Sequence, residues 1–309
     1  MIAAFPLKIS APVKHALSAK RAVLALESTV VTHGLPYPSN FEALETLEYV
    51  AREEGAVPAT IALINGVCCV GLDAADKSYL AEQFRSEKSQ DIKKIAIRDL
   101  ALAVIKGYTG GTTVSATMYL AHQAGLKVFS TGGIGGVHRG WQGTLDISSD
   151  LDALAKIPIV VVCAGSKAIL DIAATLEVLE SRSVPVLGWQ TDEYPTFYSR
   201  RSGIKIPRVG HAAEVADILR LSQNAGALKT GLLLANPIPL QDEIPVSEIE
   251  PFIQSAVADA RKRGISGKEL TPFLLSALAE STLGRSIEAN LALLKNNLRL
   301  GALIAKEMI

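Results

Sequence analysis

The stretch that decides the fold runs from Ile157 to Leu170 and reads IPIVVVCAGSKAIL. Its strand-like part, Ile159 to Cys163, is apolar at every position, so both faces of the strand are expected to be buried. Strands of this kind occur in sheets that helices cover on both sides. The run ends in small residues, Ala164 to Ser166, and then reaches Lys167 at an expected helix start. The stretch therefore predicts an α/β fold with a polar site at the carboxyl end of a buried strand.

Similar units extend along the chain from residue 21, where short β-rich runs alternate with longer segments of helical spacing. The expected strands are Ala22 to Leu26, Thr60 to Ile64, Lys127 to Ser130, Ile159 to Cys163, Val184 to Leu187 and Gly231 to Ala235. The expected helices are Asn40 to Glu54, Ser115 to Ala124, Ala168 to Glu180, Ala212 to Asn224, Val246 to Arg263, Glu269 to Glu280 and Ser286 to Glu307. We predict an α/β fold, largely a single domain over residues 1–309, whose central β-sheet is covered by helices on both faces and followed by a helical C-terminal part. The segment from Thr191 to Val209 fits neither pattern and is expected to cross the surface as a candidate lid.

Composition narrows the class of function. The chain has 309 residues with 31 Lys plus Arg and 31 Asp plus Glu, so no overall basic field favours nucleic acid. Its three cysteines, two of them adjacent at Cys68 and Cys69, cannot form a disulfide framework, and a reducing compartment fits best. The first residues lack the pattern of a signal peptide, and the aliphatic runs are too short to span a bilayer. We expect a cytoplasmic protein with a small-molecule substrate, bound neither to nucleic acid nor to a membrane.

Lys167 is the strongest single candidate for a catalytic residue. At a helix start that follows a buried strand, the helix dipole and desolvation both oppose the ammonium form and favour the neutral, nucleophilic amine. The alternative is a lysine that extends to solvent.

Glu27 lies in a second candidate segment, Ala25 to Pro38, which reads ALESTVVTHGLPYP. An apolar strand runs directly into this carboxylate, which places it at a sheet edge of low dielectric, where general acid or base chemistry is favoured. The alternative is a glutamate that caps a turn beside a surface histidine, His33.

Two glycine-rich segments are candidate phosphate sites. Tyr108 to Met118 reads YTGGTTVSATM, and Phe129 to Gly140 reads FSTGGIGGVHRG and ends with the basic pair His138 and Arg139. Glycines let backbone amides approach an anion, and a helix start adds free N–H donors. Neither segment matches the Walker or the dinucleotide fingerprint, so ordinary turns are the alternative.

Asp146 and Asp150 lie in the segment LDISSDL, Leu145 to Leu151. Oxygen ligands at this spacing suit a hard divalent cation that keeps several of its waters. Helix capping by Asp146 or Ser148 is the alternative.

Taken in order, these segments resemble the pseudouridine-5′-phosphate glycosidases, also described as indigoidine-synthase-A-like proteins. The resemblance covers nearly the whole chain. It rests on ALESTVVTHGLPYP, GAVPATIALINGV (Gly55 to Val67), KIAIRDL (Lys94 to Leu100), GGTTVSATM, STGGIGGVHRG, LDISSDL, VVCAGSKAILD, TDEYPTFY (Thr191 to Tyr198), ANPIP (Ala235 to Pro239), GKELTPFLL (Gly267 to Leu275) and GRSIEANLALLKNN (Gly284 to Asn297).

The resemblance implies reversible cleavage of the carbon–carbon bond between uracil and ribose 5-phosphate, by an enzyme classed as a carbon–oxygen lyase of the hydro-lyase group. It makes Lys167 the nucleophile that forms an imine with C1′ of the ring-opened ribose, Glu27 the proton donor and Asp146 the ligand of one Mn²⁺ per subunit. The implied substrate-binding residues are Lys94, Thr113, Val114, Ser148, Ser149, Asp150, His138 and Asn290, of which His138 and Asn290 match phosphate contacts. A homotrimer is also implied.

The chain departs from the family pattern before the Asp-Leu pair of KIAIRDL. The family usually has a serine and two arginines there, whereas this chain has Ala96, Ile97 and Arg98. The adjacent Lys93 leaves the register of Lys94 open. Two other functions are alternatives. One is an aldolase-like lyase that forms a lysine imine with another sugar phosphate, and the other is a non-catalytic protein that binds sugar phosphates or nucleotides.

Overall fold

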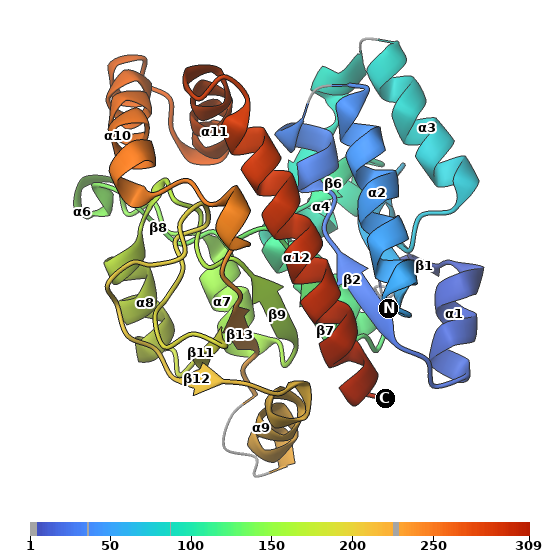
Figure 1. Ribbon diagram of the computed structural model, residues 1–309. Coiled ribbons are helices and arrows are strands. Elements are labelled where there is room, and N and C mark those ends of the chain that lie inside the picture. The colour runs from blue at the N-terminus through green and yellow to red at the C-terminus, as the bar shows by residue number, and fades with distance from the viewer. Residues whose placement is uncertain (1–4, 36, 87, 225–228) are drawn as a thin grey trace.

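The computed structural model describes residues 5–35, 37–86, 88–224 and 229–309 (Figure 1). The strands are β1 (Leu7–Ile9), β2 (Val23–Leu26), β3 (Val57–Ile64), β4 (Val67–Val70), β5 (Lys93–Ile95), β6 (Gly110–Thr112), β7 (Val128–Ser130), β8 (Val137–His138), β9 (Val160–Cys163), β10 (Leu170–Asp171), β11 (Val186–Trp189), β12 (Arg208–Val209) and β13 (Leu232–Ala235). The α-helices are α1 (Ala11–Ser18), α2 (Ser39–Glu53), α3 (Ala74–Arg85), α4 (Leu100–Ile105), α5 (Val114–Gln123), α6 (Trp141–Thr144), α7 (Ser149–Lys156), α8 (Ile172–Ser181), α9 (Ala212–Asn224), α10 (Val246–Lys262), α11 (Leu270–Ser281) and α12 (Arg285–Glu307).

The central sheet has 11 strands, and its main path runs β1-β4-β3-β2-β7-β9-β13-β11-β12. From β3 to β12 all neighbours on this path are parallel, whereas β4 and β6 pair antiparallel with β3. β8 and β10 form a separate antiparallel pair. Because β2, β7 and β9 are parallel neighbours, their carboxyl ends meet at one edge of the sheet.

Both faces of the sheet are buried, as the apolar strands require. Along β9, Val160 and Val162 pack into the core beneath α2, α9, α10, α11 and α12, while Val161 and Cys163 pack into the core on the other face. Helix α12 crosses in front of the sheet in Figure 1 and contacts β2, β7 and β9. Alternating side chains of one strand therefore serve two helical layers. The prediction of a sheet covered on both faces, with a helical C-terminal part, is confirmed.

Every strand predicted from the sequence is present, with ends that shift by up to about three residues. Six of the seven predicted helices are present in the same way. The exception is the helix expected from Ala168, because α8 begins only at Ile172. The side chain of Asp171 caps α8 by accepting a hydrogen bond from the Ala174 amide at 3.0 Å.

The segment from Thr191 to Val209 is an excursion over the surface only in its second half, where Arg201, Lys205 and Arg208 are exposed; its first half is largely buried, which the sequence analysis did not expect. Its aromatic residues Tyr194, Phe197 and Tyr198 are 0%, 3% and 2% exposed. The Phe197 amide donates to the carbonyl of Ala164, the residue after β9, at 2.9 Å. Burying three aromatic rings fixes this segment against the strand ends.

In the described part of the chain, no helix combines the length and the apolar character needed to cross a membrane.

Candidate active site

A pocket of about 200 Å³ lies where β2, β7 and β9 end. Glu27 follows β2, the glycine-rich loop that starts at Thr131 follows β7, and Lys167 lies four residues beyond β9. Open α/β sheets bind their ligands at this edge, because the loops there converge. The order of the strands therefore decides which distant parts of the chain share the pocket.

All the site residues selected from the sequence line this pocket. They are Lys167, Glu27, Lys94, Thr113, Val114, His138, Asp146, Ser148, Ser149, Asp150 and Asn290. Several residues that sequence reasoning had not placed there line it as well, among them Thr29, His33, Arg98, Phe197, Thr271 and Leu275. The structure thus brings the selected residues together, and their chemical roles stay predictions.

Lys167 lies in a turn between β9 and β10, and not at a helix start. The helix dipole expected to act on its amine is therefore not a source of reactivity here. The turn is fixed by other contacts. The Lys167 amide donates to the Ile134 carbonyl at 3.1 Å, and Ser166 beside it is fully buried with its hydroxyl 2.8 Å from that of Tyr194. Gly165, with a φ of +85°, makes the bend that turns the chain out of the strand.

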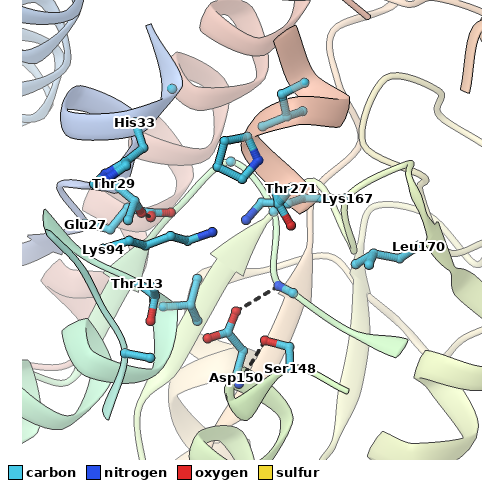
Figure 2. A pocket seen from close by; sticks show the side chains of 18 of the residues that line it. Glu27, Thr29, His33, Lys94, Thr113, Ser148, Asp150, Lys167, Leu170 and Thr271 are labelled. Carbon is cyan, nitrogen blue, oxygen red and sulfur yellow. Dashed lines mark hydrogen bonds between the residues drawn. The ribbon is translucent and has the colours of Figure 1, made fainter. Parts of the chain in front are cut away.

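The side chain of Lys167 extends into the pocket toward Lys94, whose side chain enters from the opposite wall (Figure 2). The Lys167 amine makes no hydrogen bond or ion pair with any residue that the structure describes. An amine held in a pocket without a carboxylate partner is available to attack a carbonyl carbon.

Lys94 is half-buried in β5, while Lys93 is exposed and points away from the pocket. Alternation along a strand sends neighbouring side chains to opposite sides, so only one of these lysines can line the site. Of the two lysines, the structure places Lys94 in the pocket, and its role stays a prediction.

Glu27 is held by two hydroxyl groups. The Thr29 hydroxyl donates to its Oε2, and the Thr131 hydroxyl donates to its Oε1. Thr29 belongs to the same turn, whereas Thr131 follows β7, so the carboxylate is fixed by two segments. Among the described residues no backbone amide donates to it, so a turn-capping role is not what its geometry indicates. A half-buried carboxylate of fixed orientation suits proton transfer.

Asp150 ties two walls of the pocket together. Its Oδ1 accepts the Ser115 amide, and its Oδ2 accepts the Gly135 amide, both at 2.9 Å (Figure 2 shows the second bond). The side chain is buried, with 4% of the residue exposed. Since both oxygens are engaged, Asp150 fixes the start of α5 against the glycine-rich loop.

Three hydroxyl groups lie in a row next to the Asp150 contact with Ser115. The Thr113 hydroxyl lies 3.0 Å from that of Ser115, which lies 3.1 Å from that of Ser149. Hydroxyl groups both donate and accept, so this row suits the oxygens of a sugar or a phosphate.

Packing explains part of the glycine density that the sequence analysis linked to phosphate. A Cβ on Gly133 would lie 2.6 Å from the Phe197 ring, and one on Gly135 would lie 2.4 Å from the Ser148 hydroxyl. Arg139, expected to assist His138 with a phosphate, does not line the pocket and pairs with Glu250 instead. His138 is therefore the member of that pair that reaches the site.

The two histidines of the pocket are uncharged near neutral pH. Burial lowers the pKa of His33 to about 4, and the charge of Lys94 acts in the same direction. Burial also lowers the pKa of His138; the Asp146 carboxylate opposes this shift, and the charges of Lys167 and Lys94 add to it. His33, which only the alternative reading of its segment placed at the surface, is thus a pocket residue, and both rings serve as hydrogen-bonding groups rather than cations.

Of the two aspartates that the sequence offers as metal ligands, Asp150 has both oxygens engaged by backbone amides, and Asp146 is the one that the resemblance implies. Its carboxylate lines the pocket and makes no hydrogen bond or ion pair with any described residue. No group of three or more His, Cys, Asp or Glu side chains that could hold a metal ion occurs among the described residues. A single hard oxygen donor facing an open pocket fits a divalent cation that keeps most of its waters, and does not fit a closed protein cage.

Fold and pocket together define an α/β protein with a lysine-centred site at the carboxyl ends of parallel strands. The sequence profile of the family described as "Indigoidine synthase A like protein" matches residues 12–307, and the chain belongs to this family.

Relatives of known sequence cover nearly the whole chain. A pseudouridine-5′-phosphate glycosidase of Solibacter usitatus is 48% identical over 98% of this chain and 99% of its own length. The enzyme of the same name from Petrotoga mobilis is 49% identical over 97% of this chain and 96% of its own length.

Two solved structures share the fold. An indigoidine synthase A-like protein from Thermotoga maritima has a TM-score of 0.86 and 34% identity, covering 97% of this chain and 95% of its own. The prealnumycin C-glycosynthase AlnA, in complex with ribulose 5-phosphate, has a TM-score of 0.88 and 35% identity, covering 99% of this chain and 98% of its own.

Proposed function

We propose that this chain cleaves pseudouridine 5′-phosphate reversibly into uracil and ribose 5-phosphate. The observation that carries the proposal is a Lys167 amine with no hydrogen-bond or ion-pair partner among the described residues, in the same pocket as the fixed carboxylate of Glu27 and with hydroxyl and glycine-rich walls. Relatives that are 48% and 49% identical over nearly the whole chain carry the name of this activity, which supports the choice of substrate.

The bond to be broken explains why a lysine is needed. An N-glycosidase expels a nitrogen leaving group, whereas here the leaving atom is carbon C5 of uracil. Ring opening breaks the C1′–O4′ bond, O4′ takes up a proton, and the Lys167 amine bonds to C1′ with loss of a proton. When the C1′–C5 bond then breaks, the nitrogen lone pair forms the C=N bond of an iminium, and C5 takes up a proton. Water releases ribose 5-phosphate and restores the amine.

Glu27 is the group placed to move protons in this sequence. Its two threonine contacts fix the carboxylate near the end of β2, from where it serves ring opening and the protonation of C5. Lys94, on the opposite wall from Lys167, contacts the substrate.

The remaining residues bind the substrate. His138 and Asn290 contact the 5′-phosphate, and Thr113, Val114, Ser148, Ser149 and Asp150 line the part that holds the sugar and base. A divalent cation, Mn²⁺ in this proposal, would be held by Asp146. When bound, it would supply positive charge near the substrate oxygens. The resemblance further implies a cytoplasmic homotrimer of the lyase class.

The test is release of uracil from pseudouridine 5′-phosphate by the purified protein, with Mn²⁺ and with a chelator. We expect release with Mn²⁺ and its loss on chelation. Borohydride added with ribose 5-phosphate is expected to add one sugar to the peptide that carries Lys167 and none to Lys167→Ala. Consumption of another sugar phosphate without uracil release would favour an aldolase-like lyase, and absence of the adduct would favour a binding protein.

A second candidate is a carbon–glycoside synthase with another aromatic partner. The match to AlnA, bound to ribulose 5-phosphate, is what favours it. The lower identity of that match, 35% against 48%, places it second. Pseudouridine 5′-phosphate formation from uracil and ribose 5-phosphate separates the two.

A further inference from the structure

Arg139 does not line the pocket, and its four side-chain hydrogen bonds join helix α10 to the turn that carries Lys167. Its Nη1 and Nη2 donate to Oε1 and Oε2 of Glu250 at 2.5 and 3.0 Å, a paired arrangement that fits guanidinium to carboxylate. Its Nη2 and Nε also donate to the carbonyls of Ala168 and Leu170 at 3.1 and 3.3 Å. The side chains of Arg139 and Glu250 are 27% and 30% exposed, so the pair is largely shielded from water.

The two carbonyls belong to the turn that carries Lys167. Ala168 follows Lys167 directly, and Leu170 donates its amide to the Lys167 carbonyl at 3.0 Å. The guanidinium of Arg139, which does not line the pocket, therefore holds the turn through two backbone carbonyls. Other contacts also hold the turn, among them the backbone bonds from Lys167 to Ile134 and from Phe197 to Ala164 and the Ser166–Tyr194 contact.

Glu250 lies on α10, and this helix reaches Arg139 at further points. The Arg261 guanidinium donates to the Arg139 carbonyl at 3.3 Å, and the Gln254 amide donates to Glu250 Oε1 at 3.0 Å. Replacing the hydrogen of Gly140 by a Cβ would bring it within 2.5 Å of Arg261. Helix α10 is thus fitted closely to the segment that carries His138 and Arg139.

We propose that Arg139 and Glu250 are positioning residues that fix the Lys167 turn for attack on the sugar. The inference rests on the proposed function, since it assigns the pair to the step made by Lys167. Arg139 also follows His138 directly, and β8 pairs with β10 so that His138 lies opposite Leu170. One ion pair therefore sets the spacing between the nucleophile and the phosphate-binding histidine.

Helix α10 supplies a matched control. Glu248, two residues before Glu250, pairs with Arg285 at the start of α12 and touches neither the turn nor the pocket. Glu248→Gln removes an ion pair from the same helix with the same change of charge as Glu250→Gln. A loss of activity that comes only from weakening α10 would appear in both variants.

The experiment compares Arg139→Gln, Arg139→Lys, Glu250→Gln, the Arg139→Gln/Glu250→Gln pair and Glu248→Gln in uracil release. We expect Arg139→Gln to lower kcat about 10- to 100-fold, since a misplaced nucleophile loses rate of this order, with KM changed less than about threefold. Arg139→Lys keeps the charge but not the fork of donors and is expected to recover part of the loss. The double variant should be no slower than Arg139→Gln, because both changes remove one interaction.

Hydrogen exchange of the peptide spanning 164–171 gives a readout independent of turnover. Exchange of its amides should quicken in Arg139→Gln and Glu250→Gln and stay unchanged in Glu248→Gln. Wild-type rates of hydrogen exchange in the Arg139 and Glu250 variants would overturn the proposal. An equal loss of kcat in Glu248→Gln would overturn it as well. If the wild-type protein releases no uracil while the exchange pattern is as expected, the proposed function fails and the positioning role stands.

Discussion

The hydroxyl of Thr131 donates a hydrogen bond to Glu27, so the carboxylate at the end of β2 is held by the residue that follows β7. Thr131 is fully buried, and its carbonyl accepts the Asn297 side chain of α12 at 2.9 Å. The position of Glu27 therefore depends on a neighbouring strand and on the helix above it.

Thr131→Val tests this dependence, because valine has the shape of threonine without the hydroxyl. A hydrogen bond to a charged group contributes about 1.5 to 3 kcal/mol, so we expect kcat for uracil release to fall about 10- to 100-fold. Thr131→Ser keeps the donor and should stay within about threefold of wild type. Equal activity of the valine and serine variants would show that this contact does not serve Glu27.

Lys94→Ala is expected to lower kcat/KM for uracil release at least about 100-fold, because the pocket loses a charge that faces the substrate and Lys167. Lys93→Ala is the matched control, since Lys93 is the exposed neighbour on the same strand. Steady-state kinetics of the two variants show which of the two lysines serves the reaction. A larger defect in Lys93→Ala would reverse the assignment of register.

Asp150→Asn should destabilise the fold by about 2 to 4 kcal/mol. Both carboxylate oxygens accept backbone amides, and an asparagine NH₂ would face one of those donors inside the core. Urea unfolding measures the change. Asp152→Asn on the same helix loses an ion pair to Arg182 from a side chain that is 54% exposed, so its effect should stay below about 1 kcal/mol. Similar effects of the two changes would remove the bridging role of Asp150.

His33 predicts a pH dependence of stability. Its pKa is lowered from 6.5 to about 4 in the folded protein, so between these values the unfolded chain binds more protons. The free energy of unfolding should therefore fall as pH drops from about 6.5 to 4, by up to about 3 kcal/mol for this group. His33→Gln is expected to have a shallower slope of unfolding free energy against pH in this window. The exposed His122 of α5 gives the control, as His122→Gln should keep the wild-type slope; parallel slopes for all three proteins would contradict the prediction.

The sheet was predictable because its strands are apolar on both faces. Val160 to Cys163 have no polar position at all, and that pattern is specific for a strand covered by helices on both sides. The helix expected from Ala168 was not predictable from apolar spacing, because Asp171 competes as an N-cap and delays the start to Ile172. Local capping thus outweighed periodicity.

The candidate site was predictable where its residues sit in recognisable segments at strand ends. His33 was seen in the sequence but not chosen as a site residue, since nothing local shows that Lys94 and β5 lie against it. Thr271 and Leu275 come from α11, whose sequence spacing describes its own helix and not the distant pocket it approaches. The Arg139 side chain pairs with Glu250 and does not line the pocket, and Glu250 lies more than a hundred residues later in the chain.

Helix α12 follows every described strand of the sheet in the order of synthesis, and it supplies Asn290 to the pocket and Asn297 to the Thr131 loop. On the ribosome, the strands emerge while the apolar side chains beneath α12, such as Leu24, are still uncovered. We therefore expect a nascent chain with an assembled sheet and an unfinished pocket, which becomes competent only when α12 docks. For this protein, the interval before docking is when chaperones have an apolar surface to recognise.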